Sequence, residues 1–317
     1  MISSMHIIIN EKYYAFQSDF GTEEYLKCAI CEMSDLISYS NDISHVSYGH
    51  FKIMSKTTLD EYELEHDGFT KISSGDSLDS VMFIHTSKNN MFVLLPNDIV
   101  DRQRLFEIVR WHLAYYVQLI LEKQYKYVLH ASVVEQNNRL VFIFGDSHAG
   151  KTTSMLRLMK NGYHFISDDK VAVSVSNGGL IVTPIYPYSV QVRQGVCRQI
   201  ANTIPYFEPS RDALFNTDRF RIENDVPLEI DGRNKCIICC FLSRANDFPI
   251  VPLRNSEEIV RNLCDTTILL NNGFEYRLNF IHACNCIAKA STSYSLNAFI
   301  VSEDELIALC ESGIGDE

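Results

Sequence analysis

Residues 140–169, LVFIFGDSHAGKTTSMLRLMKNGYHFISDD, contain the pattern that decides the fold. The apolar run at the start of this stretch predicts a strand, and 163–167 predicts a second one. Between them, 151–161 predicts a helix that stops at Gly162. Strand, loop, helix and strand in this order are typical of a phosphate-binding α/β domain.

The loop between the first strand and the helix fits G-x-x-x-x-G-K-[ST] completely. In this motif, consecutive backbone N–H groups surround a phosphate at the positive end of a helix. We expect Lys151 to reach the β- and γ-phosphates and the Thr152 hydroxyl to ligate Mg²⁺. The alternative, a chance match in a βα turn, is disfavoured by the flanking elements. The residues expected to bind the nucleotide are Gly145, Asp146, Ser147, His148, Ala149, Gly150, Lys151, Thr152 and Thr153.

Two adjacent acids, Asp168 and Asp169, end the second strand, one helix after the phosphate loop. In this position one carboxylate can hold Mg²⁺ while the other accepts a hydroxyl proton. A structural role is the alternative, because acids commonly end strands and begin turns. The phosphate loop upstream favours the functional interpretation.

The composition argues against several classes of protein. The chain has 28 Lys and Arg against 40 Asp and Glu, a net charge of −12, so attraction to nucleic acid or anionic lipid is not expected. No apolar run approaches the roughly 18 residues needed to span a bilayer. The first residues lack the pattern of a secretory signal. We therefore expect a soluble, cytoplasmic protein without a membrane or nucleic-acid partner.

The ten cysteines raise the question of a metal site. Cys28 and Cys31 lie in a predicted helix, and Cys236 and Cys239 lie in a predicted buried strand. Neither pair lies on the Gly- or Pro-rich turn typical of structural zinc. Free, buried cysteines are therefore expected, and a zinc-binding regulator is the alternative.

The rest of the chain divides into two expected domains. Residues 1–101 predict an α+β domain without a catalytic motif. Residues 102–317 predict the phosphate-binding domain, and a helix over 102–123 joins the two. Further expected elements are strands at 5–10, 46–54 and 125–135, a helix at 23–37, and a hairpin over 80–97 that turns at Lys88-Asn89-Asn90.

The stretch LHASVVEQNNRLVFIFGDSHAGKTTSMLRLMKNGYHFISDDKVAV, residues 129–173, resembles the catalytic core of the HPr kinase/phosphorylase family. It also resembles smaller relatives of that family, such as lasso-peptide tailoring kinases. The family pattern has a His-small dipeptide on a strand, a strand into G-D-S-x-x-G-K-[ST], a helix ending in Gly, and a strand running into D-D. All four parts occur here in order, and a weaker likeness extends the resemblance over roughly 105–310.

The resemblance implies an HPr kinase-like P-loop domain that uses ATP and Mg²⁺. It implies that Asp168 is the base that activates the acceptor hydroxyl, that Asp169 supports the metal, and that His130 lies beside the transferring phosphoryl group. Arg193 is a candidate for stabilising phosphate charge, because a guanidinium fork suits phosphate oxygens. Without the resemblance, His130 would be interpreted as a half-buried histidine on a strand, and Arg193 as a surface arginine.

The chain departs from the family pattern at two places. His148 stands where the family usually has Gly, and YSVQVRQG replaces an E-I-R-G-L-G-like signature. The second departure argues against phosphorolysis and against HPr as the substrate.

The sequence thus predicts an ATP- and Mg²⁺-dependent kinase that phosphorylates a Ser or Thr hydroxyl of a peptide or small protein, such as a biosynthetic precursor peptide. The alternatives are a kinase for a small alcohol such as free serine, and a nucleotide-binding accessory protein without catalysis. The resemblance also implies a homo-oligomer.

Overall fold

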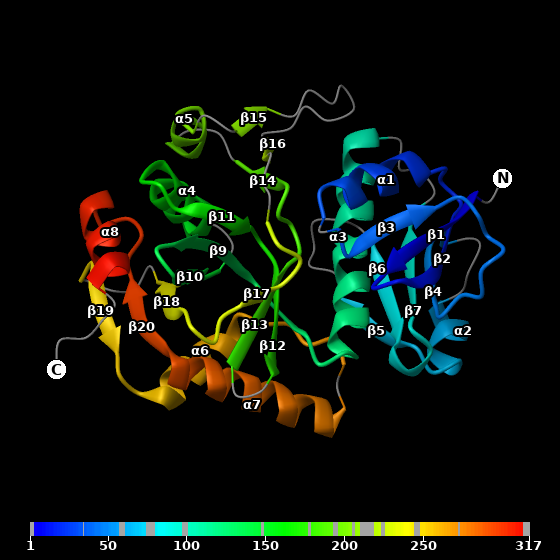
Figure 1. The fold of residues 1–317 in the computed structure, drawn as a ribbon. Helices are drawn as coiled ribbons and strands as arrows, with labels where there is room; N and C mark the ends of the chain where they lie inside the picture. The colour runs from blue at the N-terminus through cyan, green and yellow to red at the C-terminus, as the bar shows by residue number, and fades with distance from the viewer. Residues whose placement is uncertain are drawn as a thin grey trace. The chain divides into compact units, whose positions relative to one another are not determined.

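The computed structural model contains two compact units, each described by itself below (Figure 1). Unit 1 includes residues 1–124, and unit 2 includes most of the chain from Tyr125 onward. The structure describes residues 3–33, 35–56, 61–73, 80–96, 101–146, 149–176, 179–192, 196–204, 207–209, 219–222, 226–243, 248–271 and 273–312.

Unit 1 is built on a seven-stranded sheet with the order β3-β1-β2-β4-β7-β6-β5. Neighbouring strands are antiparallel except for β4, which runs parallel to both β2 and β7. The strands are β1 Ser3–Ile9, β2 Lys12–Ser18, β3 Ile37–Ser40, β4 His50–Ser55, β5 Thr70–Ser73, β6 Val81–His85 and β7 Asn90–Leu95. The helices are α1 Glu23–Cys31, α2 Glu61–His66, the short 3₁₀ helix η1 Thr86–Lys88 and α3 Arg102–Glu122.

Two expectations for unit 1 have clear outcomes. The hairpin is confirmed: β6 and β7 pair antiparallel around η1, and Asn89 takes a left-handed φ of 55°. The helix expected over 23–37 is too long, because α1 ends at Cys31. Ile37 instead pairs with Ile9 in the edge strand β3.

The long helix α3 groups with unit 1, so the division falls after Gln124 rather than after residue 101. Arg110 forms an ion pair with Glu32 at 2.7 Å. The Tyr116 hydroxyl donates to the backbone oxygen of Asn89 at 3.0 Å, and its ring stacks on Phe51. These contacts hold the helix on the elements that precede it.

His112 is buried in unit 1 on α3. Its Nδ1–H donates to the carbonyl oxygen of Ile108 at 2.7 Å, and its Nε2 accepts from the Ser80 hydroxyl at 3.3 Å. Burial lowers the pKa of His112 to about 4, because the charged imidazolium would lose its contact with water. The side chain is therefore neutral in the folded protein near pH 7.

Unit 1 is expected to lose stability as the pH falls from 6.5, the ordinary pKa of histidine, to about 4. In this window the unfolded chain binds a proton at His112 and the folded chain does not, which costs up to about 3 kcal/mol. Urea unfolding followed by the fluorescence of Trp111, the single tryptophan, measures the loss. In the control His112→Gln the loss should be smaller. An equal loss in both proteins would contradict the assignment.

The described residues of unit 2 form three sheets. The six-stranded one, ordered β11-β9-β10-β18-β20-β19, positions the candidate site. In it, β10, β18 and β20 run parallel. The others are ordered β17-β13-β12-β8 and β14-β16-β15. The strands are β8 Tyr127–Leu129, β9 Ala131–Gln136, β10 Arg139–Phe144, β11 His164–Ser167, β12 Val171–Ser176, β13 Gly179–Pro184, β14 Ser189–Gln191, β15 Phe207–Pro209, β16 Arg219–Ile222, β17 Ile230–Asp231, β18 Cys236–Leu242, β19 Ile250–Leu253 and β20 Ser291–Leu296. The helices are α4 Lys151–Lys160, α5 Val196–Ala201, α6 Ser256–Asp265, α7 Phe274–Ala290 and α8 Glu303–Ser312.

Both faces of the six-stranded sheet are covered at its central strand β10. Along β10, Val141 and Ile143 belong to the apolar cluster that includes residues of α4 and α8. Phe142 and Phe144 belong to the cluster on the other side, with residues of α6 and α7. This alternation follows from the period of two in a strand.

The expected order of strand, loop, helix and strand is present as β10, α4 and β11. At the end of α4, the Gly162 N–H donates to Met159 and the Tyr163 N–H donates to Leu158. Gly162 has a φ of 91°, so the helix ends in a Schellman motif, as the glycine predicts. The strand expected over 125–135, in contrast, is split at His130 into β8 and β9, which lie in different sheets.

The cysteines follow the expected pattern in part. Cys239, Cys240, Cys284 and Cys310 are buried and free, whereas Cys31 is exposed. Among the residues that the structure describes, no group of three or more His, Cys, Asp or Glu side chains could hold a metal ion.

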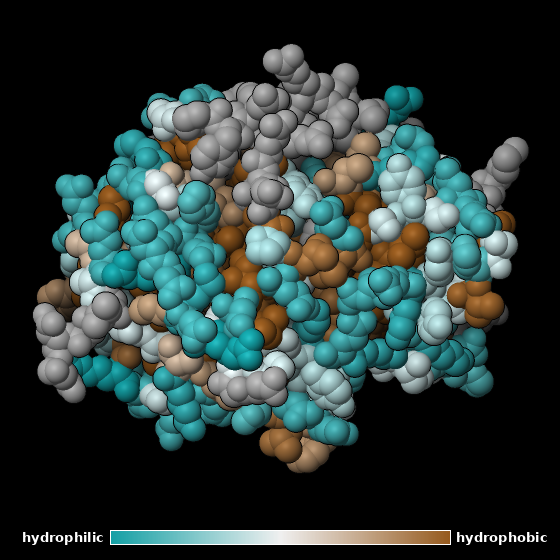
Figure 2. All heavy atoms as spheres, in the orientation of Figure 1, coloured by the Kyte–Doolittle hydropathy of each residue, from teal (hydrophilic) through white to brown (hydrophobic). Residues whose placement is uncertain are grey.

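The surface of the view in Figure 2 is largely hydrophilic, with apolar side chains in small groups. On α7, the side chains of Phe274, Leu278 and Ile281 are exposed. None of the described helices is long and apolar enough to cross a membrane.

Candidate active site

The loop between β10 and α4 depends on two glycines with positive φ, 149° at Gly145 and 103° at Gly150. A Cβ at Gly145 would lie 3.0 Å from the Cβ of Leu242 on β18. A Cβ at Gly150, which precedes the first residue of α4, would lie 3.0 Å from the Cβ of Ala298. Both positions therefore need glycine for space as well as for backbone conformation.

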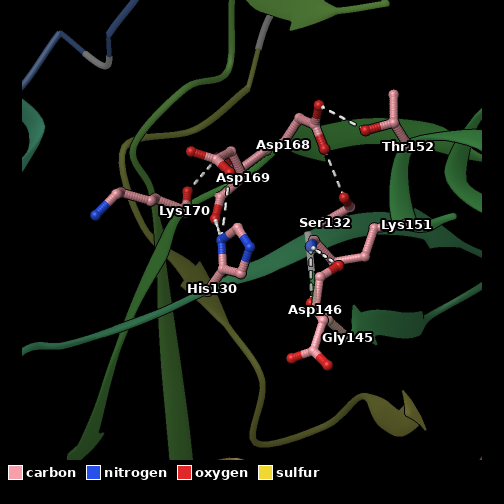
Figure 3. Close-up of polar contacts among 10 residues, drawn as sticks. His130, Ser132, Gly145, Asp146, Lys151, Thr152, Asp168, Asp169 and Lys170 are labelled. Atoms are coloured by element: carbon pink, nitrogen blue, oxygen red, sulfur yellow. Dashed lines mark hydrogen bonds and ion pairs between the residues drawn. The ribbon is translucent and has the colours of Figure 1, made fainter. Parts of the chain in front are cut away.

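Lys151 begins α4, and its side chain returns over the loop. Its Nζ donates to the backbone oxygens of Gly145 at 2.8 Å and Asp146 at 3.1 Å. The Asp146 carboxylate points away from Asp168 (Figure 3). The N-cap of α4 is Gly150, which has no side chain with which to cap the helix. The loop thus combines an ammonium group with the positive end of a helix, which suits a phosphate group.

Asp168 follows β11 and is buried. Its two oxygens accept hydrogen bonds from the Ser132 hydroxyl at 2.5 Å and from the Thr152 hydroxyl at 3.3 Å (Figure 3). Burial raises the pKa of Asp168 to about 6, and the charge of Asp169 adds to this, although the Ser132 hydrogen bond and Lys151 oppose it. Because a buried carboxylate is stabilised by a cation, this position suits a bound metal ion.

Asp169 turns away from Asp168 through a left-handed φ of 67°. The Nδ1–H of His130 lies 2.8 Å from the Asp169 backbone oxygen and 3.2 Å from its carboxylate. Burial is the main cause that lowers the pKa of His130, and the nearby Lys151 charge lowers it further. The other ring nitrogen of His130 is on the side of the ring that faces Lys151 (Figure 3). A neutral imidazole held in this way can accept a proton at that nitrogen.

Strand register brings these residues together. Phe144 pairs with Ala131, so His130 comes level with the start of the phosphate loop. β11 pairs with the other edge of β9, where Ser167 is opposite Val133, and this places Asp168 beside Ser132. Ser132 was not among the residues expected at the site, although it lies two residues after His130 on the same expected strand.

The donor set fits Mg²⁺, which binds through one or two protein oxygens and completes its shell with phosphate oxygens and water. The Thr152 hydroxyl and the Asp168 carboxylate provide two such oxygens in contact with each other. The carboxylate of Asp169 contacts His130. The structure thus pairs Thr152 with Asp168, and His130 with Asp169.

Five further residues belong to the expected site. Ser147, His148 and Arg193 lie outside the residues that the structure describes. Ala149 is buried in the loop, and its N–H donates to the Asp146 backbone oxygen at 3.1 Å. Thr153 belongs to the first turn of α4.

Comparison with known proteins adds little to this geometry. No protein-family model matches the chain, and no curated protein matches it. Among solved structures, the Hpr(Ser) kinase/phosphatase from Coxiella burnetii is similar, with 16% sequence identity and a TM-score of 0.25. The match covers 38% of this chain and 69% of that one. A likeness of this degree does not show the family of the chain.

Proposed function

We propose that the chain is an ATP- and Mg²⁺-dependent phosphotransferase that transfers a γ-phosphoryl group to a hydroxyl acceptor. One observation carries the proposal: a buried carboxylate, Asp168, accepts a hydrogen bond from Thr152, the hydroxyl residue of the phosphate loop. A loop that only bound phosphate would need Lys151 and the backbone amides. It would not need a buried carboxylate and a histidine beside them.

The chain's own groups divide into a phosphate side and a metal side. Lys151 and the amide groups at the start of α4 bind the phosphates and neutralise their charge. Thr152 and Asp168 hold Mg²⁺. The metal supplies charge stabilisation for the phosphoryl oxygens during transfer.

His130 is the group that takes the proton from the acceptor hydroxyl. Asp169 fixes the ring through Nδ1, which leaves the other nitrogen to accept the proton. The side chains of His130 and Asp169 are 36% and 41% exposed, so an acceptor can reach them from solvent. The competing assignment, in which Asp168 is the base and Asp169 supports the metal, is tested below.

A Ser or Thr hydroxyl of a peptide or small protein is the acceptor that we propose, because the His130–Asp169 pair is exposed enough for a macromolecule to approach. A small alcohol such as free serine is the alternative. The two are distinguished by whether label from [γ-³²P]ATP appears in a peptide library or in free phosphoserine.

The metal side is tested by Thr152→Ala. This change should weaken binding of ATP in the presence of Mg²⁺ by about tenfold, because a ligand of the ion is lost. Calorimetry with Mg²⁺, and again with a chelator, measures the two affinities separately. The affinity for metal-free ATP should stay unchanged.

Thr152→Ser is the matched control, because it retains the hydroxyl and should keep the affinity for MgATP. If Thr152→Ala weakened binding equally with and without Mg²⁺, the residue would act on the loop and not on the metal.

A further inference from the structure

Three apolar side chains are exposed in two neighbouring loops of unit 2. Phe248, before β19, is 69% exposed, and Phe299 and Ile300, after β20, are 68% and 51% exposed. A phenylalanine exposed to this degree buries little of its surface and contributes little to folding. The exposure of two phenylalanines at the ends of paired strands is therefore not explained by folding.

The pairing of β19 with β20 brings the two loops together. The Asn297 N–H donates to the Pro249 backbone oxygen at 3.1 Å, which continues the ladder beyond Ile250 and Leu296. Phe248 directly precedes Pro249, and Phe299 follows Asn297 by two residues, so both lie at this end of the ladder.

These loops lie next to the phosphate loop. The close approach of Ala298 to Gly150, described above, places the residue before Phe299 directly against the N-terminus of α4. β20 and β10 run parallel in the same sheet, so the loops that follow them emerge at the same edge. The two loops are therefore near enough to the phosphate loop to meet the base of a nucleotide bound there.

The turn that presents Phe299 is held in a fixed shape. Asn297 is buried, and its side-chain oxygen accepts the Phe299 N–H at 3.0 Å. Its backbone oxygen accepts the N–H groups of Ile300 at 3.0 Å and Val301 at 2.9 Å. Arg157 of α4 donates to the Val301 oxygen at 3.4 Å, which ties the turn to the helix of the phosphate loop. These hydrogen bonds fix the backbone of the turn that carries Phe299.

We propose that Phe248 and Phe299 form the surface on which the nucleobase of the bound triphosphate stacks. This inference rests on the proposed function and names the residues that bind the part of the nucleotide that the phosphate loop does not reach. Bases stack on exposed aromatic rings because both are flat and apolar. A nucleobase is preferred to a protein partner as the occupant because Ala298 abuts Gly150.

Binding of ATP and of inorganic tripolyphosphate, each with Mg²⁺, tests the inference by calorimetry. Tripolyphosphate has the same chain of three phosphates without the base. Phe299→Ala and Phe248→Ala should each weaken ATP binding by about tenfold, the loss typical of removing a stacking ring. Their affinity for tripolyphosphate should equal that of the unchanged protein. Phe299→Trp, which keeps an aromatic ring, should bind ATP as tightly as the unchanged protein.

Phe274→Ala is the matched control, because Phe274 on α7 is 84% exposed in the same unit and lies outside the two loops. It should bind both ligands normally. If both loop variants bound ATP as tightly as the unchanged protein, the proposal that the base stacks on these rings would be wrong. The proposed binding of the phosphates would not be affected by that result. If the unchanged protein bound neither ligand, the proposed function would fail and the stacking surface with it.

Discussion

Lys151→Ala should abolish measurable binding of MgATP, the largest loss of affinity expected from any single change in this chain. The ammonium group of Lys151 lies over the phosphate loop, 2.8 Å from the Gly145 oxygen. It is the charge that compensates the phosphates, and alanine leaves only the backbone amides for this task. Calorimetry should show no heat of binding at ATP concentrations that saturate the unchanged protein.

Lys160→Ala is the control for this loss, because Lys160 ends the same helix and forms an exposed ion pair with Glu303 at 3.2 Å. It should bind MgATP normally. Unchanged affinity in Lys151→Ala would show that residues 145–152 do not bind the triphosphate.

His130→Ala should lower the rate of phosphoryl transfer by about 10²–10⁴, the range typical of a lost general base, and should leave the affinity for MgATP nearly unchanged. Asp168→Asn should have the other signature. It should weaken the binding of MgATP and raise the Mg²⁺ concentration needed for transfer, because a neutral amide is a poorer ligand for a hard cation. Single-turnover transfer at saturating ATP and Mg²⁺, combined with calorimetry, separates the two effects.

The exposed His164 at the start of β11 provides the matched control, since His164→Ala should transfer at the normal rate. The competing assignment, with Asp168 as the base and Asp169 at the metal, predicts the opposite result. If Asp168→Asn kept its Mg²⁺ requirement and lost transfer while His130→Ala transferred normally, Asp168 would be the base.

The elements around the phosphate loop could be predicted from sequence because their signals are local. The end of α4 follows from Gly162, whose left-handed backbone closes the helix. β10 follows from an apolar run, and the glycines of the loop follow from the motif itself. Such features depend on neighbours in the chain, so a single sequence is enough.

Features set by pairing between distant segments could not be predicted. The strand expected over 125–135 passes from one sheet to another at His130, and the apolar pattern is the same whether a strand continues or changes sheet. Ile37 fits the apolar face of a continued α1, but its pairing with Ile9 prevails.

The contacts of the two acids also depend on pairing between segments that are distant in the sequence. The adjacency of Asp168 and Asp169 predicts that they diverge. Which of them reaches Thr152 depends on the register of β11 against β9 and on the left-handed turn at Asp169. The same holds for the loops of Phe248 and Phe299, which lie at neighbouring ends of the paired strands β19 and β20.

Transfer of label from [γ-³²P]ATP tests the central claim most directly. The protein is incubated with Mg²⁺ and a library of Ser- and Thr-containing peptides, with free serine in a parallel reaction, and the products are separated from ATP and inorganic phosphate. The account predicts a labelled phosphoester with the unchanged protein and none with Lys151→Ala. A protein that binds MgATP but yields no labelled ester with either acceptor, nor with a lysate of its source, would contradict the account and indicate an accessory nucleotide-binding protein.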